Sequence, residues 1–480
     1  MQMTARWTLA SILALALGLT ACGGAGDNGS GAGGDRDDGE RVRIDTDPFP
    51  STYSPREAPV TLIRGATILD GEGNLIENGA IILENGDIAA IGEELEIPEG
   101  EAIRVIEADG KWVTPGIIDN HSHLGVYPSP DVSAHGDGNE ISAPVTAEVW
   151  AEHGVWPQDP GFTRALAGGV TSLQILPGSA NLFGGRGVIL KNVPGRTVQE
   201  MKFPGAPYTL KMACGENPKR VYGYGGGRFP GGAPYSRMGN VAGYRMAWAE
   251  AVEYKRAWEK YEQEGGEPPK RNLELDTLKG VLDGDILVHM HCYRADEMAL
   301  ILDMAEEFGY SVAAFHHAVE SYKIADILAE SGTCSSMWAD WWGFKMEAYD
   351  GVRENIPMVH AAGACAIVHS DSDIGIQRLN QEAAKALADG RKAGIEIDKA
   401  TAWTWLSLNP ARSLGVEEQT GSLRPGKDGD VVIWSGDPFS SYTRAEKVFI
   451  DGVLMYDSTD PALQPVMDFE LGQPGEGDTK

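Results

Sequence analysis

The sequence has little positive charge. Against 70 Asp and Glu there are only 40 Lys and Arg among 480 residues, which gives a formal net charge of −30. Proteins that bind nucleic acids neutralise phosphates with Lys and Arg, so this shortage argues against nucleic acid as a partner. The surface is expected to be acidic and self-repelling. The same charge is equally compatible with adaptation to salt or with solubility, so it predicts no substrate.

Long apolar runs are missing beyond the N-terminus, which excludes a multi-span membrane protein. In residues 1–21, Arg6 precedes a short apolar run, a signal-peptide pattern too short for a spanning helix. The run ends in Leu-Thr-Ala before Cys22, which resembles a bacterial lipobox and predicts lipidation of Cys22. We therefore expect a lipoprotein of the cell envelope that faces the periplasm. The outer membrane is favoured because Gly23 rather than Asp follows the cysteine.

Aliphatic residues are scarce in the next segment, residues 22–58, which is rich in Gly, Asp, Ser and Pro. Such a segment buries too little apolar area to offset the entropy of ordering it. The composition predicts a flexible tether between the membrane and a folded domain.

Cysteine is rare as well, with five in the chain. Besides Cys22 these are Cys214, Cys292, Cys334 and Cys365. An extracytoplasmic compartment permits disulfides. Because the four are widely spaced and most fall in strand-like runs, free buried thiols are favoured, with a structural disulfide as the alternative.

Short β runs with turn signals occur near both ends of the folded part. In residues 59–113, Asn85-Gly86 separates two apolar runs, a strong hairpin signal. In residues 416–460, similar runs flank Asp428-Gly429 and Asp451-Gly452. Neither piece is long enough for a stable sheet alone, so both are expected to form one small β-sandwich domain. Residues 461–480 are left as a tail.

Between these pieces, in residues 114–415, strand-like runs alternate with helical patterns. This alternation is typical of an α/β protein with a parallel sheet, and closure of that sheet gives a (β/α)₈ TIM barrel. The Gly-rich stretch 216–236 is too long for an ordinary loop and is interpreted as an insertion or lid near the site. The runs with strand character are 112–119, 169–176, 208–214, 285–291, 310–316 and 364–370, and the helical ones are 239–263, 294–307, 321–331 and 380–393.

All ten histidines lie between His121 and His369, in the predicted barrel. Ligands from several strand ends meet at the C-terminal rim of such a barrel, so this distribution predicts a metal site there. His121 and His123 end an apolar strand, and residues two apart on a strand point to the same side. Two imidazoles at that spacing are able to hold one cation.

Several blocks together resemble the amidohydrolase superfamily, and more narrowly the imidazolonepropionase-like amidohydrolases. The resemblance covers about residues 59–457. It implies a metal-bearing (β/α)₈ barrel beside a small β-sandwich. The blocks that carry it are PGIIDNHSH (115–123), LKMACGENPK (210–219), HMHCYRADEM (289–298), HAVESYKIAD (317–326), HSDSD (369–373) and GSLRPGKDGDVVIW (421–434).

The resemblance also implies a set of metal ligands, taken over motif by motif. His291 is preferred over His289 because it is nearer the strand end, and His317 over His316, which is expected to face away or lie deeper. Asp373 is expected to lie outside the ligand set. The implied ligands are His121, His123, His291, His317 and Asp371.

A residue that bridges two metals is left with alternatives. Relatives use a carboxylated Lys or a Glu. Lys211 lies in an apolar strand, where burial favours the neutral amine that takes up carbon dioxide, and is preferred. Glu216 is the alternative, and Lys191 is a third candidate.

The donor set suits one or two divalent ions, with zinc favoured. The expected reaction is hydrolysis of a C–N bond in a cyclic amide, a dipeptide-like amide or an amidine by metal-activated water. Asp371 is expected to act as general acid and base, and His317 to help polarise the carbonyl group.

The partner is expected to be a small-molecule substrate, besides the membrane reached through Cys22, and a homo-oligomer stays open. Arg186, Arg237, Tyr293 and Trp341 are candidate substrate contacts, although a packing or solvated role is favoured for each of them. Two other functions remain open: a non-catalytic solute-binding lipoprotein on a retained barrel, and a metal-dependent isomerase or decarboxylase, because a fold does not determine a reaction.

Overall fold

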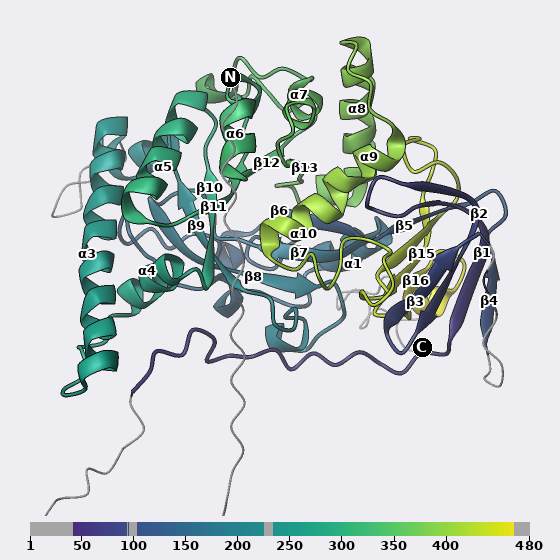
Figure 1. Ribbon diagram of the computed structural model, residues 1–480, viewed down its shortest axis with the longest axis horizontal. Helices are drawn as coiled ribbons and strands as arrows, with labels where there is room; N and C mark the ends of the chain where they lie inside the picture. Colours follow the sequence, from purple (N-terminus) through teal and green to yellow (C-terminus); the bar gives the residue numbers. More distant parts are fainter. Residues whose placement is uncertain (1–41, 94, 96–102, 225–233, 465–480) are drawn as a thin grey trace, which may run out of the picture. The chain divides into compact units, whose positions relative to one another are not determined.

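The computed structural model describes residues 42–93, 95, 103–224 and 234–464, which form two eight-stranded sheets with covering helices (Figure 1). The predicted signal peptide, Cys22, the centre of the Gly-rich stretch and most of the tail lie outside these residues. Within these ranges no helix has both the length and the apolar character needed to cross a membrane.

One sheet forms a nearly closed barrel, as predicted. Across the gap between its first and last strands, the backbone N–H of Asp371 donates to the carbonyl oxygen of His121 at 3.1 Å. In spatial order the strands are β6 (Ile117–Ser122), β7 (Val170–Ile175), β8 (Phe183–Lys191), β9 (Tyr208–Ala213), β10 (Ile286–His291), β11 (Val312–His316), β12 (Cys334–Met337) and β13 (Ala366–Val368).

Strand β8 departs from the all-parallel arrangement, since it runs antiparallel to both β7 and β9. The connection 176–182 is too short to hold the crossover helix that a parallel pair needs. The reversal places Lys191 at the opposite end of the barrel from the other strand ends. There its ammonium donates to Asp428 at 2.7 Å and Asp451 at 2.5 Å, so Lys191 as a bridging ligand was wrong.

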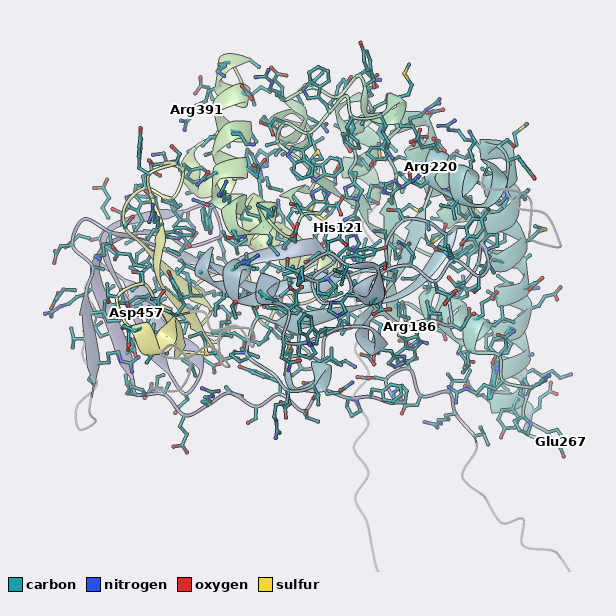
Figure 2. All side chains as sticks on the ribbon, turned by 180° about the vertical axis from the view of Figure 1, so that it is seen from behind. His121, Arg186, Arg220, Glu267, Arg391 and Asp457 are labelled. Atoms are coloured by element: carbon teal, nitrogen blue, oxygen red, sulfur yellow. A yellow bond between two sulfur atoms is a disulfide. The ribbon has the colours of Figure 1, made fainter. Side chains whose placement is uncertain are left out.

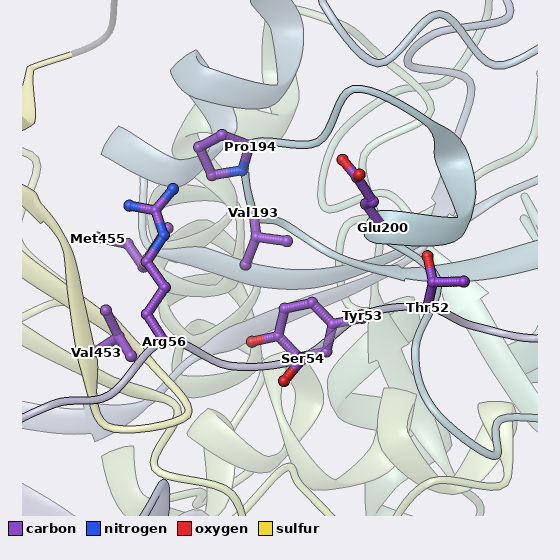
Figure 3. Close-up of a pocket in the computed structure, with 9 residues that line it drawn as sticks. All are labelled: Thr52, Tyr53, Ser54, Arg56, Val193, Pro194, Glu200, Val453 and Met455. Carbon is purple, nitrogen blue, oxygen red and sulfur yellow. The ribbon is translucent and has the colours of Figure 1, made fainter.

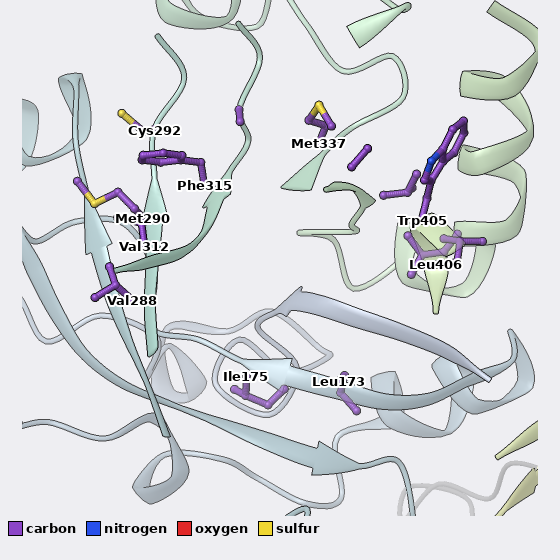
Figure 4. Close-up of a cluster of buried hydrophobic side chains, with 14 of the residues drawn as sticks. Leu173, Ile175, Val288, Met290, Cys292, Val312, Phe315, Met337, Trp405 and Leu406 are labelled. Atoms are coloured by element: carbon purple, nitrogen blue, oxygen red, sulfur yellow. The ribbon is translucent and has the colours of Figure 1, made fainter. Parts of the chain in front are cut away.

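The predicted helical stretches are all helical in the structure. On β10, alternate residues Val288 and Met290 pack outward with Phe315 of β11 (Figure 4), so His289 and His291 face the barrel interior. The helices are α1 (Pro160–Ala167), α2 (Glu216–Pro218), α3 (Arg237–Glu264), α4 (Leu273–Asp283), α5 (Ala295–Phe308), α6 (Ala325–Ser331), α7 (Asn355–Ala361), α8 (Leu379–Lys392), α9 (Lys399–Trp403) and α10 (Leu408–Leu414).

The second sheet joins both ends of the folded part, as predicted, and Ile63 and Phe449 share its apolar core. Asn85-Gly86 and Asp451-Gly452 form hairpin turns with positive φ, whereas Asp428-Gly429 lies in a loop. The order is β16 (Val453–Asp457), β15 (Ala445–Ile450), β14 (Val431–Trp434), β5 (Trp112–Pro115), β1 (Thr61–Leu69), β2 (Leu75–Glu84) and β3 (Asp87–Gly92), with β4 (Arg104–Glu107) beside β1.

The run 112–119 was predicted as one strand, but it is two. Strand β5 pairs with β14 in the second sheet, and after Gly116 the chain enters the barrel as β6. A Cβ atom at Gly116 would lie 2.0 Å from the Thr171 hydroxyl oxygen, so only glycine fits at this crossing. The chain therefore changes domain within one apolar run, which periodicity alone does not reveal.

The predicted tether is not free over residues 43–58, which lie along the barrel and lead into the second sheet (Figure 1). The Lys202 ammonium, nearly fully buried, donates to Asp47 at 2.7 Å and to the carbonyl oxygen of Phe49 at 2.8 Å. The Ser51 hydroxyl donates to the carbonyl oxygen of Lys202. A buried cation needs partners, and this segment supplies them. The tether prediction was wrong for these residues.

A cavity of about 250 Å³ lies where this segment meets the second sheet (Figure 3). Tyr53 and Arg56 line it with Val193, Glu200 and Met455. The Tyr53 hydroxyl donates to Asp451, and burial with the nearby carboxylates raises its pKa. None of the predicted metal ligands is among the residues that line this cavity, so it belongs to the domain junction.

Two disulfides correct the prediction of free thiols. Cys214–Cys292 joins the ends of β9 and β10, with 5.2 Å between Cα atoms, and Cys334–Cys365 joins β12 to the start of β13, with 4.5 Å. In each pair the cysteines are far apart in sequence but lie on neighbouring strands, so the barrel order brings them together.

Replacing Cys214 and Cys292 together by Ala should lower the free energy of unfolding by about 2–4 kcal/mol, because the denatured chain loses a long closed loop. Denaturant titrations with and without reductant measure this. The Cys334→Ala/Cys365→Ala pair is the matched control, since its loop is shorter and its loss should be smaller. An unfolding midpoint equal to that of the wild type would contradict a stabilising Cys214–Cys292 bond.

Candidate metal centre

Seven of the ten histidines gather inside the barrel at the ends of β6, β10, β11 and β13. His121 lies among the barrel strands in Figure 2. Burial lowers the pKa of most of the cluster, for example to about 3 at His289 and about 4 at His369. The six imidazoles whose pKa is lowered are therefore neutral, which is the form that binds metals. The seven are His121, His123, His289, His291, His316, His317 and His369.

Three donor atoms converge at the end of β6. The Nε2 atoms of His121 and His123 lie 3.3 Å apart, and Asp371 Oδ1 lies 3.4 Å and 3.2 Å from them. Zinc bonds of 2.0–2.1 Å in tetrahedral geometry place neighbouring ligand atoms about 3.3 Å apart. The spacing of these atoms therefore fits one divalent cation.

The tautomer of His123 supports this fit. Its Nδ1 lies 2.8 Å from the carbonyl oxygen of Leu176, which only accepts, so Nδ1 carries the proton. His123 Nε2 lies 3.2 Å from the carboxylate of Asp371. The Leu176 carbonyl holds the imidazole as metal-ligating histidines are commonly held, with Nε2 directed toward the other donor atoms.

His317 is oriented by His369, a residue that sequence reasoning missed. The backbone N–H of His317 donates to His369 Nε2 at 3.3 Å, so that nitrogen is an acceptor. His317 Nδ1, 2.9 Å from the same atom, must then donate. The lone pair of His317 Nε2 faces Asp371 Oδ2 at 3.6 Å, as a ligand's would. His369 precedes Asp371 by two residues, a strand spacing that could have revealed it.

His317 and Asp371 both have left-handed backbone conformations, with φ of 56° and 50°. Each follows the end of a barrel strand. Such a conformation costs a non-glycine residue about 1–3 kcal/mol and is retained where the surrounding structure imposes it. Both side chains point into the cluster from these strained positions, which is consistent with a functional site.

Lys211 is the bridging candidate that lies in the cluster. It is fully buried on β9, and its Nζ is 3.4 Å from His121 Nε2. Burial lowers the pKa of Lys211 to about 7, although the nearby negative charge of Asp371 acts to raise it. Glu216 instead pairs with Lys345 at 3.7 Å and is partly exposed.

His291, from β10, has an unused donor atom. Its Nε2 lies 3.3 Å from the amide nitrogen of Asn217, whereas its Nδ1 is buried without a hydrogen-bond partner among the described residues. Its ring centroid is 5.0 Å from that of His317. Because the Asn217 amide donates to Nε2, the ring proton of neutral His291 lies on the unpartnered Nδ1, so His291 lies beside the cluster without a free lone pair in this arrangement, and its role as a ligand stays a prediction.

Asp119 ties the first and last barrel strands at this site and was also missed. Its Oδ1 accepts from the backbone N–H groups of His121 at 3.1 Å and Ser370 at 3.2 Å. Burial raises the pKa of Asp119 to about 7. These bonds hold the backbone of His121 and of the residue before Asp371. Asp373 lies away from the ligands, 3.4 Å from the Ser129 hydroxyl, as expected.

The candidate substrate contacts are placed differently from one another. The guanidinium of Arg186 donates to the carbonyl oxygen of Thr46 and to Thr277, both at 2.8 Å, and lies 4.1 Å from the Trp150 ring centroid. Figure 2 shows it toward the docked N-terminal segment. Because these contacts occupy it, the structure does not support Arg186 as a substrate clamp.

Arg237, at the start of α3, is also engaged by the chain. It donates to Glu297 at 2.7 Å and to Glu347. It lines a charged cleft of about 660 Å³ together with Glu216. Its contacts are those of a residue that holds the rim of the site together.

Aromatic residues form the wall beside His317. Trp338 stacks on the His317 ring at 4.4 Å, and Tyr293 contacts the rings of His291 and His317 at 4.7 Å and 5.9 Å. Trp341 packs on Trp338 at 5.3 Å and is 41% exposed. Tyr293 and Trp341 therefore remain candidate substrate contacts, one buried and one at the surface.

Comparisons with known proteins agree with this geometry. The Amidohydrolase family matches residues 112–455. Amidohydrolase tasK of Hapsidospora irregularis is 32% identical over 442 residues, covering 84% of this chain but 44% of the relative, so the chain spans less than half of its length. An imidazolonepropionase of Mesorhizobium japonicum is 24% identical over 403 residues, covering 77% of this chain and 90% of that protein.

The crystal structure of an amidohydrolase from Thermotoga maritima MSB8 superposes with a TM-score of 0.75 and 34% sequence identity. The superposition covers 83% of this chain and all of that one. Because the family match spans most of the chain and this structure shares both its sequence and its fold, the chain belongs to the amidohydrolase family.

Proposed function

We propose that the protein is a metal-dependent hydrolase that cleaves a C–N bond. The observation that carries the proposal is the convergence of His121 Nε2, His123 Nε2 and Asp371 Oδ1 within 3.2–3.4 Å of one another. Family membership and the imidazolonepropionase relative support it. Neutral imidazoles with a carboxylate favour zinc or a similar divalent ion.

When bound, such an ion supplies Lewis acidity that lowers the pKa of water and polarises a carbonyl group. The chain's own contribution is proton transfer by Asp371, which is the partly exposed carboxylate of the cluster. Its Oδ accepts the proton of the attacking water and later delivers it to the leaving nitrogen. His317 acts as a ligand in this proposal, because its Nδ1 proton is held by His369 and its Nε2 has none to donate.

Lys211 is proposed to be carboxylated. A neutral amine adds to carbon dioxide, forming an N–C bond and releasing one proton, and burial keeps this amine neutral more readily than a surface lysine. The resulting carboxylate would be an anionic ligand beside His121, whose Nε2 lies 3.4 Å from Lys211 Nζ, and would help to hold two cations.

The proposed substrates are a cyclic amide, a dipeptide-like amide or an amidine. We also propose a location in the cell envelope with an anchor at Cys22, favouring the outer membrane. The lipobox-like sequence supports this, and so do two disulfides, which persist in oxidising compartments.

The proposed function is tested by metal analysis of the purified protein and by assays with a panel of cyclic amides, dipeptides and amidines. We expect bound zinc or a similar ion, turnover of at least one panel class, loss of turnover on chelation and recovery on re-addition of metal. Absence of both metal and turnover would favour a solute-binding protein. Turnover without C–N cleavage would favour an isomerase or decarboxylase.

Asp371→Asn should lower kcat by about 10²–10⁴-fold while metal remains bound, because the amide keeps the shape but not the basicity of the carboxylate. Steady-state kinetics with metal analysis measure both quantities. Asp373→Asn is the matched control, since Asp373 lies outside the ligand cluster. Wild-type turnover in Asp371→Asn would refute the proton-transfer role.

Lys211→Met should abolish the mass increase and the ¹³C carbamate signal expected after incubation with labelled bicarbonate, because no amine remains. It should also reduce the metal content per chain. Lys211→Glu, which carries a carboxylate on a shorter side chain, should recover part of the metal content. A carbamate signal that persists in Lys211→Met would assign carboxylation to another lysine.

A further inference from the structure

His289 and His316 lie deeper in the barrel than the proposed ligands, and the mechanism above does not use them. Both are fully buried, and so is His121. The three rings form a chain of contacts that ends on the main chain of α10, at the carbonyl oxygen of Ser413, 3.0 Å from His289 Nε2. A carbonyl oxygen accepts and never donates, so His289 must carry its proton on Nε2.

The rest of the chain follows from this one bond. With one proton on each ring, His289 Nδ1 has a lone pair, and His316 Nε2, 2.8 Å away, must donate to it. His316 Nδ1 is then an acceptor, and His121 Nδ1, also 2.8 Å away, must donate in turn. His121 is left with its lone pair on Nε2, the atom that lies 3.3 Å from His123 Nε2 and 3.4 Å from Asp371 Oδ1.

No other neutral arrangement satisfies all three contacts. If one ring carried its proton on the other nitrogen, two N–H groups or two lone pairs would face each other at 2.8–3.0 Å. All three rings are fully buried, so no water would replace the lost hydrogen bond. Ser413, whose carbonyl oxygen accepts from His289, is itself held in place. Its hydroxyl donates to the carbonyl oxygen of Pro410 at 2.8 Å and accepts from Asn120 at 3.0 Å. Asn120 is the residue before His121.

We propose that His289 and His316 are positioning residues. Through their hydrogen bonds, the Ser413 carbonyl oxygen determines which nitrogen of His121 is protonated, and this directs the His121 Nε2 lone pair to the metal. The pair holds a ligand in its binding tautomer, and neither ring is a ligand or a catalytic residue. The inference rests on the proposed metal centre, but the tautomers themselves are a property of the metal-free protein.

The first test is NMR of metal-free protein labelled with ¹⁵N at histidine. The wild type should show His121 protonated on Nδ1, and His289 and His316 protonated on Nε2. Protonation of His121 on Nε2 would overturn the proposal, whether or not any variant folds. If the tautomers are as expected but the protein binds no zinc, the tautomer assignment stands and the proposed metal centre is refuted. This outcome separates the two claims.

The second test compares variants of His289 by zinc affinity in competition with a chromogenic chelator. His289→Phe keeps a ring but removes the acceptor, and should weaken zinc binding by about 10–100-fold and mix the His121 tautomers. His289→Asn places Oδ1 where Nδ1 was and should restore most of the affinity. His360→Phe, at a half-buried histidine on α7 that contacts Trp405, is the control and should bind zinc as the wild type does.

Equal losses in His289→Phe and His289→Asn would overturn the proposal, because they would indicate that packing alone matters. Wild-type affinity in His289→Phe would overturn it as well. Thermal unfolding of each metal-free variant separates a loss of folding from a loss of affinity.

Discussion

A neutral buried imidazole that faces a main-chain carbonyl oxygen must direct its ring proton to that oxygen, and the orientation of the centre depends on this constraint. The barrel interior buries a cluster of imidazoles and lowers their pKa values, so none of the buried rings relies on a charge or on solvent. Main-chain carbonyl oxygens, which accept only, then decide the tautomers. Leu176 does so for His123 and Ser413 does so, through two rings, for His121.

The scaffold around the cluster keeps these contacts in register. Asp119 joins β6 to the turn after β13, at the gap where the barrel closes. Cys214–Cys292 joins the ends of β9 and β10, next to Lys211 and His291. Each bond crosses between strands that contribute to the centre, so the positions of the donor atoms depend on the closed sheet rather than on any single loop.

Residues 43–58 and the end of the chain near the second sheet supply hydrogen-bond acceptors to buried cations of the barrel. Lys202 and Arg186 are cations inside the protein that bind carbonyl oxygens and a carboxylate of residues 43–58. Lys191, at the reversed end of β8, binds Asp428 and Asp451 near the second sheet. These cations lie within an acidic chain, and each is matched by acceptors from a distant part of the sequence.

Local patterns predicted the alternation of strands and helices, the hairpin at Asn85-Gly86 and the placing of His121 and His123 at a strand end, because side-chain periodicity and turn chemistry act over a few residues. The positions of His317 and Asp371 at strand ends were implied by the resemblance to the amidohydrolases. They did not predict the reversed β8, the change of sheet at Gly116 or the docking of residues 43–58, which depend on what lies opposite in space.

The same division holds at the site. The residue types by themselves indicated a cation-binding centre, since neutral imidazoles and a carboxylate are its usual ligands. Only the tertiary structure decided that Lys211 rather than Glu216 lies in the histidine cluster, that the four cysteines pair, and that His316 and His369 contact His121 and His317. Hydrogen-bond direction is a property of pairs of atoms, and the members of these pairs come from strands far apart in the chain.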